Sequence, residues 1–257
     1  MNPAVQEFRS RRTSLLCVDD TPVLGAVRIP VADLANRTFE LPSRAEVAKV
    51  ADTGDGAAEA VAWLERHRRQ ARLSSFELGE ERRRLMLWSP NDFLLGVLSE
   101  LPPTSALDLA CGVGREAVAM SCCGWDVHAL DILPDALQRA RSLESRYSTG
   151  SAIRWGAADL EDPCFVPDRR MGLVTMFRYL HRPHFQRMRD WLAPGGSLVM
   201  ETFTTVHRAA FGRPKSDDHV LEPGELPNLV DEMEIVRYEE GWRAGAHTAR
   251  LWARVRG

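Results

Sequence analysis

The chain has 257 residues, which is enough for one large domain or for one domain with a smaller companion. Its 44% hydrophobic and 27% charged residues are typical of a soluble globular protein. A net charge of -3 argues against a general nucleic-acid binder, and the sequence holds no apolar run long enough to predict a membrane span.

The five cysteines favour a reducing compartment, because an odd number in a chain of this size predicts free thiols. Their spacing lacks the paired Cys-x-x-Cys motifs of a zinc site, so no metal is expected. Residues 1–12 lack the apolar core of a signal peptide. We therefore expect a cytoplasmic protein, with an organelle matrix left open.

The first third of the chain predicts short strands and one helix. Leu15–Val18 and Val47–Val50 have the apolar character of strands, and Ala57–Arg69 has the spacing of a helix. Two charged runs, Arg66–Arg72 and then Glu77–Arg84, predict a solvated linker and the beginning of a helix, with a basic patch as the alternative.

From about Glu80 onward strands and helices alternate. Helices are predicted at 85–98, 115–123, 135–145, 184–192 and 223–231, and strands at 107–110, 126–131, 152–156, 172–177, 196–202, 233–239 and 247–255. This alternation predicts an α/β fold with a doubly wound, mostly parallel sheet of seven strands, covered by helices on both faces. The last two strands have no helix between them and should pair antiparallel. We place a small segment at 1–75 and the main domain at 76–257.

The most informative stretch is Leu107–Arg115, a strand that ends in an acid and a Gly-x-Gly turn before a helix. Gly112-x-Gly114-x-x-Ala117 fits the fingerprint of a nucleotide cofactor, and Asp131 follows at the end of the next strand. A plain glycine turn before a helix is the structural alternative. Asp108, and Asp159 after the third strand, favour a cationic adenosine cofactor over a pyrophosphate.

These residues resemble the first motif and the acidic positions of class I methyltransferases that use S-adenosylmethionine. The resemblance implies a Rossmann-like fold and that cofactor. The residues that it implies for cofactor binding are Asp108, Ala110, Cys111, Gly112, Gly114, Asp131, Ile132, Ala158, Asp159 and Phe177. On this view a side chain at Gly112 or Gly114 would crowd the methionine carboxylate of the cofactor.

Further motifs narrow the resemblance to the branch related to tellurite-resistance methyltransferases. They cover residues 85–257 and include Gly124–Val127, Asp131–Leu137, Arg178–Pro183, Phe211–Pro214 and Leu221–Leu226. They do not identify a substrate.

The front of the chain resembles a degenerate rhodanese, or sulfurtransferase, domain. Gly25–Pro30, Asp33-Leu34 and Glu40–Pro42 carry the resemblance. At the place of the nucleophilic cysteine the chain reads Ala51–Gly56, with an aspartate where a thiolate would stand. We therefore expect a structural or regulatory segment without sulfurtransferase activity, through which a protein partner could bind.

The methyl acceptor is expected at the carboxyl ends of the fourth and fifth predicted strands. The residues there are Arg178, Tyr179 and Glu201, to which we assign the orientation of the acceptor. His181 could act as a base or only cap a helix, and the segment 204–225 is predicted to be a lid.

The sequence thus predicts a methyltransferase that acts on a small or exposed nucleophile. Two alternatives remain open. One is a cofactor-binding module without catalysis, and the other is a nicotinamide-dependent oxidoreductase that uses the same glycine turn. The acceptor is not identified.

Overall fold

The computed structural model describes residues 2–256, which divide into two compact units. One unit is Gln6–Ser89, and the other consists of residues 90–256 with residues 2–5. The junction between Ser89 and Pro90 lies downstream of the boundary at 75/76 that the composition suggested.

The smaller unit is built on a parallel sheet of four short strands in the order β2-β1-β3-β4. The strands are β1 (Leu15–Cys17), β2 (Val27–Arg28), β3 (Ala48–Ala51) and β4 (Ala71–Ser74), and the helices are α1 (Pro3–Ser10), which begins in the other unit, α2 (Asp55–Arg66), η1 (Val31–Asp33) and η2 (Thr38–Glu40). Helix α2 packs its apolar face, which includes Ala57, Ala60 and Leu64, into the core around Leu16 and Val50.

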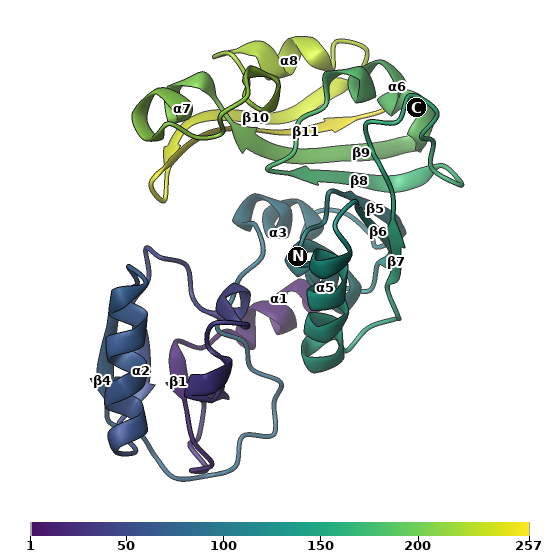
Figure 1. Cartoon of the computed structure of the whole chain (residues 1–257). Helices are drawn as coiled ribbons and strands as arrows, with labels where there is room; N and C mark the ends of the chain where they lie inside the picture. Colours follow the sequence, from purple (N-terminus) through teal and green to yellow (C-terminus); the bar gives the residue numbers. More distant parts are fainter. Residues whose placement is uncertain (1, 257) are drawn as a thin grey trace. The chain divides into compact units, whose positions relative to one another are not determined.

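The larger unit contains a seven-stranded sheet in the order β10-β11-β9-β8-β5-β6-β7 (Figure 1). Its strands are β5 (Ser105–Leu109), β6 (Asp126–Asp131), β7 (Arg154–Ala157), β8 (Met171–Phe177), β9 (Leu192–Phe203), β10 (Glu234–Arg243) and β11 (Ala246–Arg254). Strands β5 to β9 run parallel, whereas β11 is antiparallel to both β9 and β10. The predicted α/β fold and the antiparallel final pair are confirmed.

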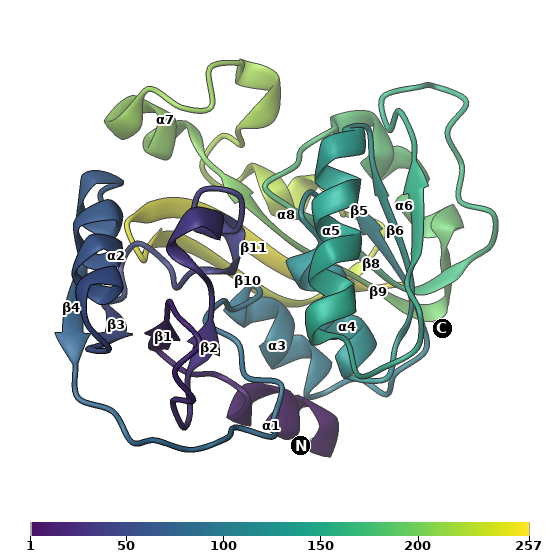
Figure 2. The ribbon, with the colours of Figure 1, turned by 60° about the horizontal axis from the view of Figure 1, so that its bottom comes forward.

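Helices cover both faces of this sheet, as predicted. They are α3 (Asp92–Leu98), α4 (Arg115–Cys122), α5 (Pro134–Tyr147), η3 (Arg182–His184), α6 (Phe185–Trp191), α7 (Thr205–Phe211), η4 (Asp217–His219) and α8 (Glu225–Leu229). Helices α4 and α5 lie side by side against β5, β6 and β7 (Figure 2). Helices α6, α7 and α8 cover β9 and β11 from the other face (Figure 1). Because the central strands are covered on both faces, they are apolar along nearly their whole length.

Two local predictions were wrong. The helix expected at 85–98 begins only at Asp92, because Pro90 disfavours helical backbone before it and Asn91 caps the helix. The Asn91 side chain accepts hydrogen bonds from the backbone N–H groups of Phe93 (2.9 Å) and Leu94 (3.2 Å). The strand expected at 196–202 begins at Leu192 instead, so that Ala193–Gly196 lies inside β9, where the register with β8 shifts.

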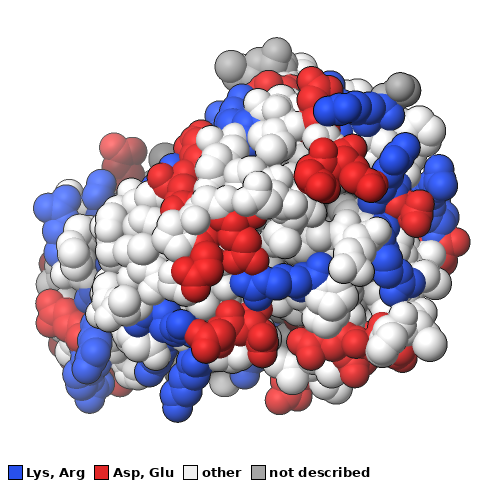
Figure 3. Space-filling view, turned by 90° about the horizontal axis from the view of Figure 1, so that it is seen from above, with Lys and Arg blue, Asp and Glu red and all other residues white. Residues whose placement is uncertain are grey.

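Charged side chains are mixed on the face seen in Figure 3, where acidic groups lie beside basic ones. Among residues 2–256, no helix combines the length and the apolar character that crossing a membrane requires.

Candidate functional site

The turn after β5 is built from left-handed backbone. Ala110, Gly112 and Gly114 have φ values of +54°, +54° and +78°, and Gly114 is the N-cap of α4. Glycine adopts such values without strain, whereas Ala110 does so at a cost. The Cys111 backbone N–H donates to the Leu130 carbonyl at 2.9 Å, which holds the turn against the end of β6.

Asp131, at the end of β6, joins two turns through one carboxylate. It accepts hydrogen bonds from the backbone N–H of Gly112 (2.7 Å) and from that of Leu133 (2.9 Å). The side chain is 7% exposed, so these two donors offset the cost of burying its charge. A carboxylate has further lone pairs, so Asp131 can still accept from a ligand hydroxyl.

Asp108 is the buried acid of the site. Its Oδ1 atom accepts from the Thr175 hydroxyl at 2.8 Å, whereas its Oδ2 atom makes no hydrogen bond of normal geometry with any residue of the range 2–256. Burial, and then the charge of Glu116, raise the pKa of this carboxyl well above its usual range. An acceptor left without a donor in a buried site fits a ligand that brings a cation or a donor.

A pocket of about 320 Å³ opens beside these turns. It is lined by Ala110, Asp131, Ile132, Asp159, Leu160, Glu161 and Tyr179. The structure thus brings together four of the residues predicted for the cofactor and adds Leu160 and Glu161, which the sequence reading missed. It also places Tyr179 on this pocket, although the sequence reading assigned it to the acceptor.

Three further predicted residues, Cys111, Ala158 and Phe177, lie at the carboxyl ends of the strands without lining the pocket. Cys111 is buried, and burial raises the pKa of its thiol. Ala158 follows β7 and donates its N–H to the Asp131 carbonyl at 3.2 Å. Phe177 is the last residue of β8 and is half-buried.

Tyr179 is positioned by a buried histidine that the sequence reading did not assign to the site. The Tyr179 hydroxyl lies 3.3 Å from Nε2 of His184, which is 3% exposed. Burial, aided by His181 and Arg187, lowers the pKa of His184 to about 4, so its ring is neutral at pH 7. Burial raises the pKa of Tyr179, with help from Glu161 and Asp159, so its hydroxyl keeps its proton and can donate to His184.

The turn after β8 repeats the strained conformation of the turn after β5. Arg178 has a φ of +59°, and its N–H donates to the Glu201 carbonyl at 2.8 Å. Strands β5 and β8 are neighbours from which the sheet extends in opposite directions, so their carboxyl ends flank the topological switch point. Left-handed non-glycine residues at both ends mark this edge as the functional one.

Glu201 is engaged within the protein. Its Oε1 atom accepts from the Thr248 hydroxyl at 2.6 Å, and its Oε2 atom accepts from the Asn91 side-chain amide at 2.8 Å. These bonds link β9 to β11 and to the N-cap of α3. The geometry therefore favours a structural role for Glu201, the alternative to orienting an acceptor.

In the smaller unit, Ala51–Gly56 runs from the last residue of β3 through a turn at 52–54 into the first residues of α2. Cys17 is 2% exposed, and burial is the main cause that raises the pKa of its thiol. A protonated, buried thiol is a poor nucleophile.

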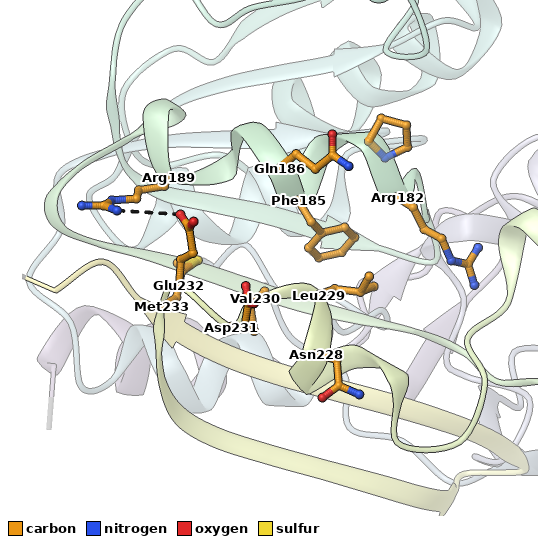
Figure 4. A pocket seen from close by; sticks show the side chains of 11 residues that line it. Arg182, Phe185, Gln186, Arg189, Asn228, Leu229, Val230, Asp231, Glu232 and Met233 are labelled. Atoms are coloured by element: carbon orange, nitrogen blue, oxygen red, sulfur yellow. Dashed lines mark ion pairs between the residues drawn. The ribbon is translucent and has the colours of Figure 1, made fainter.

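A second cavity, of about 480 Å³, lies between η3–α6 and the segment from α8 to β10 (Figure 4). Both arginines that line it have partners within the chain: Arg189 pairs with Glu232 at 3.7 Å, and Arg182 pairs with Glu225 at 2.6 Å. Although larger, this cavity is not lined by the left-handed turns after β5 and β8, whereas Ala110 and Tyr179 of those turns line the smaller pocket, which is therefore the better candidate site. Among residues 2–256, no three His, Cys, Asp or Glu side chains cluster in a way that could hold a metal ion.

Comparison with known proteins agrees with this geometry. Residues 106–196 match a family described as a methyltransferase domain. No curated protein sequence matches the chain.

Among solved structures, the N-methyltransferase NodS from Bradyrhizobium japonicum is similar at 22% identity and a TM-score of 0.52, over 64% of this chain and 93% of that one. NodS in complex with S-adenosylhomocysteine gives 21% identity and a TM-score of 0.52, over 63% of this chain and 83% of that one. TehB from Haemophilus influenzae is similar at 17% identity and a TM-score of 0.52, over 63% of this chain and 61% of that one. These likenesses show that the larger unit has the Rossmann-like methyltransferase fold.

The two glycines of the turn make a matched pair for a stability test. A Cβ at Gly114 would lie 2.5 Å from the Trp155 ring and 2.9 Å from Ala140, whereas a Cβ at Gly112 would meet no atom within 4 Å. The crowding expected at Gly114 is therefore with the protein. Gly112→Ala should lower the free energy of unfolding by about 1–2 kcal/mol through backbone strain alone, and Gly114→Ala should lower it by more. Equal losses in urea denaturation would contradict this packing.

For Glu201→Gln we expect a free energy of unfolding that is lower by about 1–3 kcal/mol, because a glutamine cannot accept both hydrogen bonds. Thr248→Val, which removes one of the two donors, should also destabilise the protein, whereas Thr248→Ser should not. Thermal and urea unfolding measure both effects. A Glu201→Gln protein as stable as the wild type would show that these bonds are not structural.

Proposed function

We propose that the chain is an S-adenosylmethionine-dependent methyltransferase. The observation that carries the proposal is the pocket at the carboxyl edge of β5 and β6, where Ala110, Asp131, Ile132 and Asp159 meet within the segment that matches a methyltransferase domain. The fold and the S-adenosylhomocysteine complex of a structural neighbour support it. The tellurite-resistance branch that the sequence motifs indicated stays part of this proposal.

The residues of the site fit this cofactor. Asp131 would accept from the ribose hydroxyls, Asp159 from the adenine amine, and Ile132, which is 57% exposed, would cover the adenine ring. Asp108 offers a buried acceptor to a cationic ligand. When bound, S-adenosylmethionine supplies an activated methyl group that a nucleophile displaces in line.

What the protein contributes is position and exclusion of water. Aligning two reactants in a site can lower a barrier by about 7–11 kcal/mol. Asp131, through its two hydrogen bonds, and the Tyr179–His184 pair hold the walls of the pocket before any ligand binds. The acceptor is placed at the ends of β8 and β9, beside Arg178.

The two alternatives gain no support from the comparisons. A nicotinamide cofactor carries a pyrophosphate, and the carboxylates of Asp131, Asp159 and Glu161 on one pocket would repel it. For the smaller unit, the buried Cys17 and the cysteine-free turn at 51–56 support a non-catalytic role, and partner binding is our proposal for it.

Calorimetric titration tests the cofactor directly. We expect S-adenosylhomocysteine to bind with micromolar or better affinity, NAD to bind much more weakly, and S-adenosylmethionine to be converted to S-adenosylhomocysteine when an acceptor is supplied. Tight binding of NAD with no binding of S-adenosylhomocysteine would refute the proposal. Binding without turnover on any acceptor would favour the non-catalytic module.

Variants of Asp131 and Asp159 distinguish an acid that also stabilises the fold from one that only binds the ligand. Asp159 is exposed, and its Oδ1 accepts the local Glu161 N–H at 2.9 Å. Either change to asparagine should weaken binding of S-adenosylhomocysteine by about 1.5–3 kcal/mol, since each removes a charged acceptor. Only Asp131→Asn should also lower the melting temperature. Unchanged affinity in both variants would remove these acids from the site.

A further inference from the structure

Five rings form a continuous surface at the carboxyl end of β9. They are Phe203 at the end of β9, His207 and Phe211 in α7, and Trp242 and His247 at the tip of the β10–β11 hairpin, and we call them the aromatic shelf. The ring centroids of successive members lie 4.3 Å (Phe203–His207), 4.7 Å (His207–Phe211), 6.0 Å (Phe211–Trp242) and 5.4 Å (Trp242–His247) apart. Figure 1 shows α7 beside the tip of this hairpin.

The shelf presents large apolar rings to water. Phe211 is 55% exposed and Trp242 is 54% exposed, and they contact each other. Adjacent exposed aromatic side chains are characteristic of binding sites, because burying them against a ligand recovers hydrophobic free energy. A planar aromatic ring is the ligand group that such a surface packs against best.

His207 behaves as a neutral ring within the shelf. Its Nδ1 atom accepts from the His247 backbone N–H at 3.3 Å, so that nitrogen carries no proton. Burial, together with His247 and Arg178, lowers the pKa of His207. It stacks on Phe203 with ring planes 19° apart, so this pair adds uncharged aromatic rings to the shelf, whose other neighbouring rings meet at 41° to 84°.

Arg178 supplies a positive charge at the edge of the shelf. Its guanidinium lies 5.9 Å from the centroid of the Phe203 ring. Neighbouring arginines are paired, Arg182 with Glu225 and Arg250 with Glu239. Arg178 is exposed and, within residues 2–256, pairs with no carboxylate. Its guanidinium is thus available to an anionic oxygen group, whose geometry it matches with two parallel N–H donors.

The shelf borders the cofactor pocket through the turn after β8. Arg178 contacts the shelf, and the next residue, Tyr179, lines the pocket of Asp131 and Asp159. The left-handed backbone of Arg178, held by its N–H bond to the Glu201 carbonyl, directs consecutive side chains to the two sites. A ligand on the shelf therefore lies on the acceptor side of the cofactor.

We propose that the aromatic shelf and Arg178 bind the methyl acceptor, and that this acceptor carries a planar aromatic ring with an anionic oxygen group. The ring packs on Phe203, Phe211 and Trp242, and the anion pairs with Arg178. This inference rests on the proposed methyltransferase function and names the substrate class of the same site.

Four probes separate the ring from the charge. They are 3,4-dihydroxybenzoate (ring and carboxylate), phenyl phosphate (ring and phosphate), catechol (ring alone) and cyclohexanecarboxylate (carboxylate alone), each titrated calorimetrically into the full chain with and without S-adenosylhomocysteine. We expect at least one aromatic anion to bind about tenfold tighter than catechol and cyclohexanecarboxylate. The stronger of the two aromatic anions identifies the anionic group.

Variants test the assigned residues. Arg178→Met should lower the affinity for the aromatic anion by about tenfold or more, because the variant loses a charged hydrogen-bonding partner. The same variant should bind S-adenosylhomocysteine as the wild type does. Trp242→Ala should lower the affinity for both catechol and the aromatic anion, because both pack a ring on the shelf. The matched control is Arg187→Met, because Arg187 also lies over an aromatic ring, 5.6 Å from the centroid of Trp191, but outside the shelf.

The outcomes distinguish this inference from the proposed function. If S-adenosylhomocysteine binds but the four probes bind equally or not at all, the shelf is not an acceptor site of this class. The same conclusion follows if Arg178→Met and Arg187→Met weaken the aromatic anion equally. If the aromatic anion binds through Arg178 while S-adenosylhomocysteine does not bind, the ligand class stands and the methyltransferase proposal fails.

Discussion

The candidate site depends on the carboxylate of Asp131, which holds two turns at one edge of the sheet. Its bonds to the N–H groups of Gly112 and Leu133 join the glycine turn after β5 to the turn after β6. A buried carboxylate is costly unless donors surround it, so the two turns and the acid stabilise one another. Ala110 and Ile132, which flank this link, line the pocket, so its walls are in place before a ligand binds.

The carboxyl edge of the sheet has two halves with different chemistry. The half at β5 to β7 is acidic, with Asp131, Asp159 and Glu161 around one pocket, as expected for a ligand with hydroxyl, amine and cationic groups. The half at β8 to β11 is aromatic, with Arg178 as its charge. Because the strained turn after β8 belongs to both halves, the distance between the two ligands would be set by backbone and not by flexible side chains.

Much of the architecture followed from local patterns. Strand β6 has the predicted limits, and the central helices and strands differ from prediction by one to three residues at most ends, because buried parallel strands and amphipathic helices leave strong periodic signals. The helix predicted at 85–98 failed because apolar residues at Leu85 and Leu87 belong to the core of the other unit, which periodicity alone does not reveal. Asp131 and Asp159 could be predicted because strand ends of a parallel sheet share one edge, whereas Glu161, which also lines the pocket, was missed.

The sequence by itself determined the fold class, the glycine turn and the acids at Asp108, Asp131 and Asp159, since each depends on short-range spacing. Only the tertiary structure decided which polar groups already have partners. In the tertiary structure Glu201 bonds to Asn91 and Thr248, Arg182 pairs with Glu225, and Tyr179 lies against His184. Arg178, by contrast, pairs with no carboxylate of residues 2–256. It also gathered the five rings of the aromatic shelf from four elements, β9, α7, β10 and β11. Such pairings join residues as many as 110 positions apart, and no local pattern encodes contacts over that separation.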